Sequence, residues 1–203
     1  MIECKTTGML ATNSYIISNN DNECVLVDPG LGYKEVYEYI KKKYIVKAIL
    51  LTHGHFDHID GIQYFMDVPI YIHKLDEEFL YDSSLSLYNM ISRSAPFSKG
   101  DLDIRLVYDG SEFSLIGYNF KVIHTPGHTR GSVCYLYEEG MLTGDTMFNG
   151  TCGRIDFPTG SIYDMMNSLK LLVNNYNEQI ICYPGHESFT TIGAEKNNNP
   201  CLR

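Results

Sequence analysis

The sequence predicts a mixed α/β domain built from alternating short strands and helices. Its 203 residues are 44% hydrophobic and 20% charged, which is ordinary for a globular protein. Strand-like runs outnumber helix-like runs, and helices fall between strands in both halves of the chain. Two packed sheets flanked by helices satisfy this pattern, although other α/β layouts do so as well. We expect residues 1–203 to form one domain.

The first half of the chain opens with three short strands, expected at residues 2–10, 14–18 and 24–27. The third is apolar throughout (CVLV) and stops at the turn sequence DPG, as expected for a strand covered on both faces. A helix with a basic end is predicted over residues 33–43. A strand at 46–51 then runs into the sequence THGH, a helix is expected after Ile59, and another strand at 69–73. Residues 74–95 predict an irregular helical segment.

The second half repeats this plan more loosely. Strands are expected at residues 104–108, 112–115, 120–124, 132–137 and 140–143. A helix at 162–174, a strand at 179–183 and a short helix near Ile192 complete the prediction.

Charge and composition exclude several classes of function. The net charge of -9 disfavours non-specific binding to nucleic acid, which depends on clustered Lys and Arg. No apolar run approaches the roughly 20 residues that span a bilayer, and the N-terminal sequence MIECKTTGML has no secretory pattern. The six cysteines form no CxxC pair, which indicates reduced thiols in a cytoplasmic protein. A catalytic thiol at Cys152 is the less favoured alternative for that residue.

The strongest chemical signal is the hexapeptide HGHFDH at residues 53–58, where an apolar strand ends. In an extended segment alternate side chains share a face, so His53, His55 and Asp57 are expected to point into one cavity. His58 joins them once the chain turns toward the next helix. Four ligands of the types that zinc and iron accept cannot all bind one tetrahedral ion, which indicates two adjacent ions. A polar surface turn is the alternative, disfavoured because three of the seven histidines fall in this hexapeptide.

Three further positions supply potential ligands on glycine-containing loops that follow strands. They are His128 in TPGHT, Asp145 in TGDT and His186 in PGH. Taken singly, a buried histidine or a turn-capping aspartate explains each, but their recurrence beside the hexapeptide favours a metal site. His73 is expected to be a packing or surface residue, and His124 at most to orient a ligand from behind.

The motifs THGHFDHIDG, TPGHTRGS, TGDTMF and PGH, in this order, resemble the metallo-β-lactamase superfamily over nearly the whole chain. The resemblance implies an αββα four-layer sandwich, made from two similar halves, with metals at one edge between the sheets. Asp28, in VDPG, matches a motif that supports the metal loops and is not itself a ligand. The implied roles are a first metal on His53, His55 and His128, a second on Asp57, His58 and His186, and a bridge through Asp145.

Within that superfamily, the stretches GTCGRIDFPTGS and PGHESFTTIGAEKNNNP are most similar to the glyoxalase II (hydroxyacylglutathione hydrolase) branch, particularly its short single-domain members. This similarity implies a hydrolase with two divalent metal ions, zinc first and iron or manganese as alternatives. Metal-activated hydroxide would attack a thioester or related ester, with Asp57 orienting the water. Glyoxalase II proper continues into a helical domain that contributes to glutathione binding, whereas this sequence ends at Arg203. The thiol portion of the substrate and the oligomeric state are therefore left open.

Arg154, in the glycine-rich stretch after Asp145, has two interpretations. Its planar guanidinium would clamp a substrate carboxylate, or it would pair with Asp156 or another acid and shape the loop. Residues 74–95 offer Tyr81, Tyr88 and Met90 as a wall of the cleft, although such side chains more often belong to a core.

The main rival prediction is an oxidoreductase. Persulfide dioxygenases also resemble this chain in HxHxDH, TPGHT and GDT, which would imply one iron on His53, His128 and Asp145. Imidazole and carboxylate ligands suit both metals and do not separate the two. A hydrolase of lactones or phosphodiesters is a further alternative. A flavin-linked diiron protein and a catalytically inactive scaffold are disfavoured, because His55 is intact and no ligand position is lost.

Overall fold

The computed structural model describes residues 1–32, 34–138 and 140–203 and contains two six-stranded sheets. The first has the order β1-β2-β3-β4-β5-β6, formed by β1 (Ile2–Thr7), β2 (Thr12–Ser18), β3 (Glu23–Val27), β4 (Ile45–Leu50), β5 (Ile70–His73) and β6 (Ile104–Val107). Strands β1 to β3 pair antiparallel, and β3 to β6 pair parallel. The second sheet has the order β12-β11-β10-β9-β8-β7, formed by β7 (Glu112–Leu115), β8 (Tyr118–His124), β9 (Val133–Tyr137), β10 (Gly140–Gly144), β11 (Ile181–Pro184) and β12 (Thr190–Thr191). Only the β10–β11 pair is parallel among the described pairings of this sheet.

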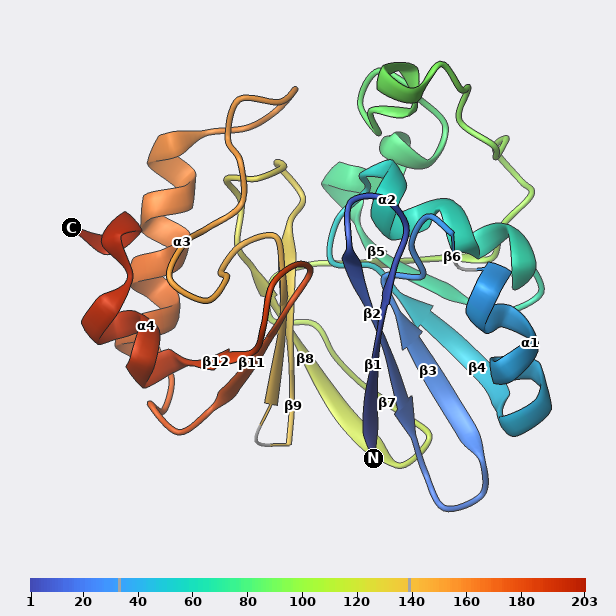
Figure 1. Cartoon of the computed structure of the whole chain (residues 1–203), viewed down its shortest axis with the longest axis horizontal. Helices are drawn as coiled ribbons and strands as arrows, with labels where there is room; N and C mark the ends of the chain where they lie inside the picture. Colours follow the sequence, from blue (N-terminus) through green and yellow to red (C-terminus); the bar gives the residue numbers. More distant parts are fainter. Residues whose placement is uncertain (33, 139) are drawn as a thin grey trace.

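The alternation of side chains along the strands produces the layers. In β2 and β3, Ile16 and Leu26 face an outer cluster shared with the helix α1 (Lys34–Lys43). Their neighbours Ile17 and Val25 face a cluster between the sheets, where residues of β8, β9 and β10 meet them. A third cluster packs Leu169 and other residues of the helix α3 (Ile162–Asn175) on the outer face of the second sheet. With α1 on one side and α3 on the other (Figure 1), the αββα four-layer prediction is confirmed.

Most predicted elements are present, with shifted ends. The first strand ends at Thr7 instead of residue 10, because residues 8–11 form the turn into β2. The predicted start of the first helix at Tyr33 lies outside the described residues, and α1 is described from Lys34. The short helix near Ile192 is α4 (Ile192–Asn198). The strand β12 and a terminal 3-10 helix, η4 (Pro200–Leu202), were not predicted.

One helical prediction was wrong in its bounds, and a second, of an irregular helical segment, was confirmed. The helix expected after Ile59 begins earlier: α2 (Phe56–Ile59) ends at that residue and continues as the 3-10 helix η1 (Asp60–Tyr64). The irregular segment at 74–95 contains two 3-10 helices, η2 (Lys74–Leu80) and η3 (Tyr88–Ile91). Leu87 and Ser92 bound η3 with left-handed backbone angles (φ +66° and +56°), which a continuous right-handed helix cannot contain.

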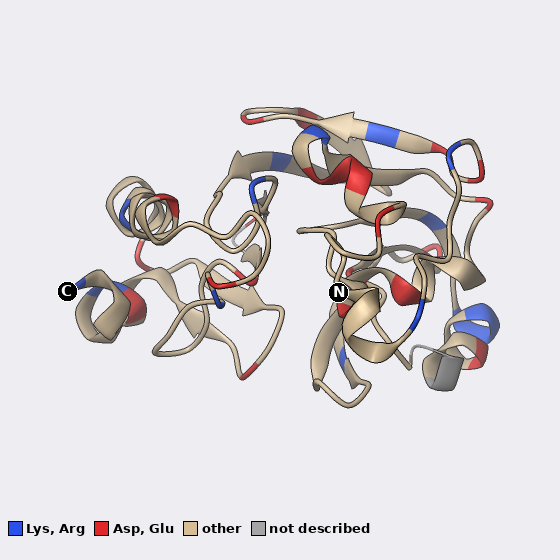
Figure 2. Cartoon of the chain, turned by 90° about the horizontal axis from the view of Figure 1, so that it is seen from above, with Lys and Arg blue, Asp and Glu red and all other residues tan. Residues whose placement is uncertain are grey.

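Strand ends position the candidate site. The strands β4, β8, β10 and β11 each lead at their C-terminal ends into one of the loops predicted to carry ligands, and these loops meet beside α2. Viewed onto that end of the molecule, acidic and basic positions are interspersed along the ribbon and no long basic stretch is seen (Figure 2). No helix in the described part of the chain is long and apolar enough to cross a membrane.

Candidate metal centre

The hexapeptide divides between two kinds of backbone. His53 and His55 precede α2, and His55 is its extended N-terminal cap (φ -73°, ψ 149°). Asp57 and His58 lie within α2, so the expectation that Asp57 shares the face of an extended segment was wrong. The turn into the helix at Phe56, whose N–H donates to the carbonyl of Ser86, brings Asp57 to the cluster instead.

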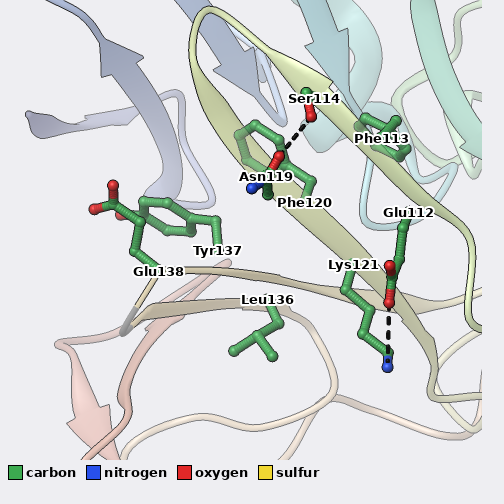
Figure 3. Close-up of a pocket in the computed structure, with 9 residues that line it drawn as sticks. All are labelled: Glu112, Phe113, Ser114, Asn119, Phe120, Lys121, Leu136, Tyr137 and Glu138. Carbon is green, nitrogen blue, oxygen red and sulfur yellow. Dashed lines mark hydrogen bonds and ion pairs between the residues drawn. The ribbon is translucent and has the colours of Figure 1, made fainter.

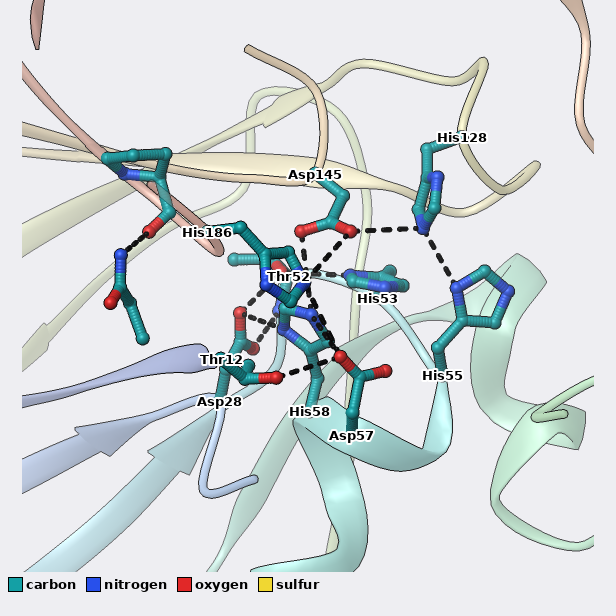
Figure 4. A network of polar contacts seen from close by, with 12 residues as sticks. Thr12, Asp28, Thr52, His53, His55, Asp57, His58, His128, Asp145 and His186 are labelled. Atoms are coloured by element: carbon teal, nitrogen blue, oxygen red, sulfur yellow. Dashed lines mark hydrogen bonds and ion pairs between the residues drawn. The ribbon is translucent and has the colours of Figure 1, made fainter. Parts of the chain in front are cut away.

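The four loops bring all seven predicted side chains together (Figure 4). His58 Nε2 lies 3.4 Å from both Asp57 Oδ2 and Asp145 Oδ1, and His128 Nε2 lies 3.4 Å from Asp145 Oδ2. His186 Nε2 lies 3.4 Å from Asp57 Oδ2 and 3.6 Å from Asp145 Oδ2. Asp145 therefore lies between the two sets of imidazoles.

The first set of imidazoles surrounds His53. The His55 Nδ1 and His128 Nε2 atoms are 2.8 Å apart. The His53 ring centroid lies 4.7 Å from that of His128 and 4.8 Å from that of His55. Gly185 permits the close approach of the last loop, since a Cβ there would collide with Asp145 Oδ1.

Three imidazoles contact a polar group outside the cluster through Nδ1, which leaves Nε2 as the nitrogen that each presents to the cluster. His58 Nδ1 lies 3.0 Å from Asp28 Oδ2, His128 Nδ1 donates to the Arg154 carbonyl at 2.7 Å, and His186 Nδ1 donates to the Leu10 carbonyl at 3.1 Å. In each case Nε2 is left facing the carboxylates, the arrangement in which histidines commonly bind metals.

Asp28 supports two parts of the centre at once. Its Oδ1 accepts from the Thr52 N–H at 2.8 Å, and its Oδ2 accepts from the Thr52 hydroxyl at 2.6 Å while also contacting His58. It therefore ties the end of β4 to α2, the supporting position that the VDPG motif predicted. It also lies close enough to His53 and His58 for the three to form a candidate ligand group.

Two supporting residues were missed from the sequence. Thr12 donates its hydroxyl to Asp57 Oδ2 at 2.8 Å. Asp76, fully buried in η2, accepts from the N–H of Gly54, the N–H of Gly131 and the hydroxyl of Thr129. It thereby joins the loop of His53 and His55 to the loop of His128. The segment KLDEEFL holds three acids in a row, so the sequence did not single out Asp76, and its partners lie 22 to 55 residues away.

The buried carboxylates of the centre favour a positive charge beside them. Asp28, Asp57 and Asp145 are all buried. Burial alone would lower the pKa of His58, but these three carboxylates outweigh it and raise that pKa to about 10. Burial and neighbouring imidazoles lower the pKa values of His53 and His55, so these two present neutral, metal-binding nitrogens.

Buried nitrogen and oxygen atoms that lack a hydrogen bond test whether a metal ion fits this centre. Among the described residues, His53 Nε2, His58 Nε2 and Asp145 Oδ1 are buried and form no hydrogen bond, although the last two lie 3.4 Å apart as an ion pair. Burying a polar atom without a hydrogen bond or a metal ion lowers the stability of the fold. Two candidate ligand groups, each with donor atoms within 4.8 Å of one another, are His53, His55 and His128, and Asp57, His58 and His186. The residues present thus fit a binuclear metal site.

A cavity of about 500 Å³ opens above the cluster. Five predicted ligands contribute to its lining, and apolar residues form much of the remainder. Arg154 lines it too, but the guanidinium donates to both Asp156 carboxylate oxygens at 2.9 and 2.7 Å. The segment proposed as a wall contributes Met90, whereas Tyr88 is buried in the core. The complete lining is Met9, Leu10, His55, Phe56, Asp57, Leu87, Met90, Ile91, His128, Asp145, Phe148, Arg154, Phe157, His186 and Glu187.

The remaining candidate residues lie outside this centre. His73 is buried and stacks on His124 with ring centroids 4.2 Å apart, so its packing role is as expected. The His124 Nε2 atom contacts the Arg130 carbonyl rather than a predicted ligand. Burial raises the pKa of the Cys152 thiol to about 12, which disfavours a thiolate nucleophile. All six cysteines are free.

A second hollow, of about 450 Å³, lies over β7, β8 and β9 (Figure 3). None of the seven predicted ligands lines it. Two pairs of its polar side chains contact one another, namely the ion pair of Glu112 with Lys121 and the hydrogen bond of Ser114 with Asn119. Its described lining contains no histidine, cysteine or aspartate, so it offers no ligand cluster comparable to that of the first cavity.

Comparison with known proteins points to one family. The model of the metallo-beta-lactamase superfamily matches residues 7–186. An uncharacterized protein of Mycobacterium tuberculosis is 37% identical, over 96% of this chain and 94% of its own length. Hydroxyacylglutathione hydrolase GloC of Haemophilus influenzae is 31% identical over 94% and 92%, and the probable metallo-hydrolase YqgX of Bacillus subtilis is 31% identical over 96% and 94%.

Solved structures agree with this assignment. The BLEG-1 B3 metallo-beta-lactamase matches with a TM-score of 0.90 and 31% identity, over 100% of this chain and 99% of its own. TTHA1623, solved in a di-iron-bound form, matches with a TM-score of 0.82 and 32% identity, over 98% of each chain. ETHE1 from Myxococcus xanthus, with a TM-score of 0.77, covers 98% of this chain and 83% of its own, but at 23% identity it shares the fold alone.

Proposed function

Because the chain belongs to the metallo-beta-lactamase superfamily, we propose that it is a metal-dependent hydrolase that cleaves a thioester or related ester. The observation that carries the proposal is the set of buried ligand atoms on His53, His58 and Asp145 that form no hydrogen bond, placed among three buried carboxylates. The likeness to GloC, whose name describes a hydroxyacylglutathione hydrolase, supports a small thioester substrate.

We assign the metal ligands as the two candidate groups and the position of Asp145 suggest. His53, His55 and His128 would hold one ion, Asp57, His58 and His186 a second, with Asp145 bridging them. Imidazole and carboxylate donors suit zinc, which we propose as the resident metal, and they suit iron and manganese as well.

Two divalent cations held there would lower the pKa of a bound water and make hydroxide available at neutral pH. The protein's own contribution centres on Asp57. Burial alone would raise the pKa of its carboxyl, but His58 and His186 lower that pKa below its usual range, so the group stays ionised. With Oδ2 fixed by the Thr12 hydroxyl, Asp57 would orient the attacking water. Water adds to the carbonyl carbon, the C–S bond breaks, and the products are a carboxylic acid and a thiol.

Metal content and turnover test the proposal together. Protein produced without metal bias would be assayed for metal per chain, for thioester hydrolysis, and for oxygen uptake with glutathione persulfide. We expect two metal ions per chain, thioester turnover and no oxygen uptake. One iron per chain with oxygen consumption would instead establish the dioxygenase alternative. Turnover confined to lactones or phosphodiesters would keep the metal centre but replace the substrate class.

A further inference from the structure

We propose that the cleft selects a thioester whose thiol arm is an uncharged hydrocarbon and disfavours a carboxylate-bearing thiol such as glutathione. This inference rests on the proposed hydrolase function and concerns the part of the substrate that extends away from the metal centre.

Apolar side chains from two separate segments stand exposed at the cavity. Met9 (79% exposed) and Leu10 (47%) come from the turn between β1 and β2, and Met90 (63%) comes from η3. Neighbouring exposed apolar groups at the rim of one cavity are typical of a binding surface. A hydrocarbon arm would remove them from water, and the flexible methionines would adapt to its shape.

Apart from the metal ions proposed at its base, the cavity has little positive charge to offer an anionic arm. Among the described residues that line it, Arg154 is the one Lys or Arg side chain, and it is already paired with Asp156 through two hydrogen bonds. Its guanidinium also lies over the Phe157 ring, 4.2 Å from the centroid. Glu187 adds a negative charge to the lining.

A substrate carboxylate would gain little binding free energy at Arg154, because Asp156 already occupies the guanidinium. A substrate carboxylate would have to share the guanidinium with Asp156, which already accepts from its Nε and Nη2 atoms, so the new ion pair would be weaker than one to a free arginine. Glutathione carries two carboxylates and one ammonium group, and Glu187 would repel the surplus negative charge. An uncharged hydrocarbon avoids this competition and gains the apolar contacts of Met9, Leu10 and Met90. The balance therefore favours the hydrocarbon.

The test holds the acyl group constant and varies the thiol. The metal-loaded enzyme would be assayed with acetyl thioesters of glutathione, N-acetylcysteamine and benzyl mercaptan, which are anionic, uncharged polar and uncharged apolar. We expect kcat/KM for the benzyl thioester to exceed that for the glutathione thioester by about tenfold, with N-acetylcysteamine between them. Equal or higher kcat/KM with glutathione would overturn the inference. Equal values for benzyl mercaptan and N-acetylcysteamine would show the hydrocarbon assignment to be wrong.

Variants separate the charge argument from the apolar one. Asp156→Asn releases Arg154 and should raise kcat/KM for the glutathione thioester by about fivefold, with no change for the benzyl thioester. The double variant Asp156→Asn with Arg154→Gln should lose that gain. Met90→Ser should lower kcat/KM for the benzyl thioester about threefold, mainly through KM. Met66→Ser, at an exposed methionine outside the cavity, is the matched control and should change nothing.

The two proposals fail in different ways. If none of the three thioesters is hydrolysed while the protein holds its metals, the proposed function is wrong. If all three are hydrolysed and glutathione is preferred, the hydrolase proposal stands and the inference about the thiol arm is wrong.

Discussion

The ligand cluster and the apolar side of the cavity, which we call its floor and its wall, are stabilised by different physical interactions. The floor is the set of seven predicted ligands, of which five line the cavity, and it is nearly all buried. Three of its five imidazoles contact a polar group through the ring nitrogen that faces away from the cluster. The wall, formed by Met9, Leu10, Leu87, Met90 and Ile91, includes the exposed Met9, Leu10 and Met90. Buried polar groups must be satisfied in one geometry, whereas apolar contacts tolerate several. We therefore expect substitutions in the floor to act on metal binding and stability, and those in the wall on substrate choice.

The largest effect is expected at Asp145, which lies between the two sets of imidazoles. Asp145→Ala removes the proposed bridge and should lower thioester turnover by about a thousandfold or more. Metal content per chain should fall in parallel, measured on the same samples by elemental analysis. Asp103→Ala, at an exposed acid next to β6, is the control. Undiminished turnover in Asp145→Ala would show that the whole site assignment is wrong.

A pH-dependent stability is expected from Asp76, which holds two ligand loops from behind. Burial raises its pKa to about 6, against a value near 4 in the unfolded chain. The folded protein thus retains this proton between the two values, so the free energy of unfolding falls as pH rises from about 4 to about 6. The contribution amounts to about 3 kcal/mol.

Asp76→Asn tests this dependence because asparagine does not titrate. Denaturant unfolding gives the free energy of unfolding of both proteins between pH 4 and 7. The difference between the two free energies should change from about pH 4 to about 6 and stay constant above it. Parallel profiles across the whole range would contradict the assignment to Asp76.

A smaller effect, on metal affinity, is expected from a substitution of Asp28. This residue contacts His58 but is not assigned as a ligand. Asp28→Asn removes the charge that orients His58 and should weaken metal affinity by about tenfold to a hundredfold. Competition with a chromogenic chelator measures this affinity. Asp109→Asn, which alters a carboxylate bonded to the His124 N–H, is the control. Complete loss of the second metal in Asp28→Asn would indicate a direct ligand instead.

The smallest effect is expected in the wall. Leu10→Ser changes an exposed side chain but keeps the backbone carbonyl that accepts from His186. The free energy of unfolding should change by no more than about 0.5 kcal/mol, and metal content should be unchanged. Denaturant unfolding and elemental analysis check both. A large loss of metal would show that the wall also holds the floor in place.

The sequence alone determined which residues meet at the centre. The hexapeptide and the three later loops each follow a strand, and loops at the C-terminal ends of strands that run in the same direction lie at one edge of a sheet. The motif order then implied the αββα sandwich, which strand alternation alone did not separate from other α/β layouts. Local pattern also located most strands to within a few residues, since alternation and turn residues are encoded by neighbours in sequence.

Only the tertiary structure decided how those residues are held and what surrounds them. Asp57 reaches the cluster from a helix, because packing at Phe56 starts α2 earlier than the sequence pattern predicts. Asp76 meets partners up to 55 residues away, and no local signal encodes such contacts. The pairing of Arg154 with Asp156 and the joint exposure of Met9, Leu10 and Met90 likewise depend on loops brought together from distant parts of the chain. The types of the ligand residues can be read from the sequence. The hydrogen bonds that position them and the side chains that line the cavity depend on which residues are neighbours in space.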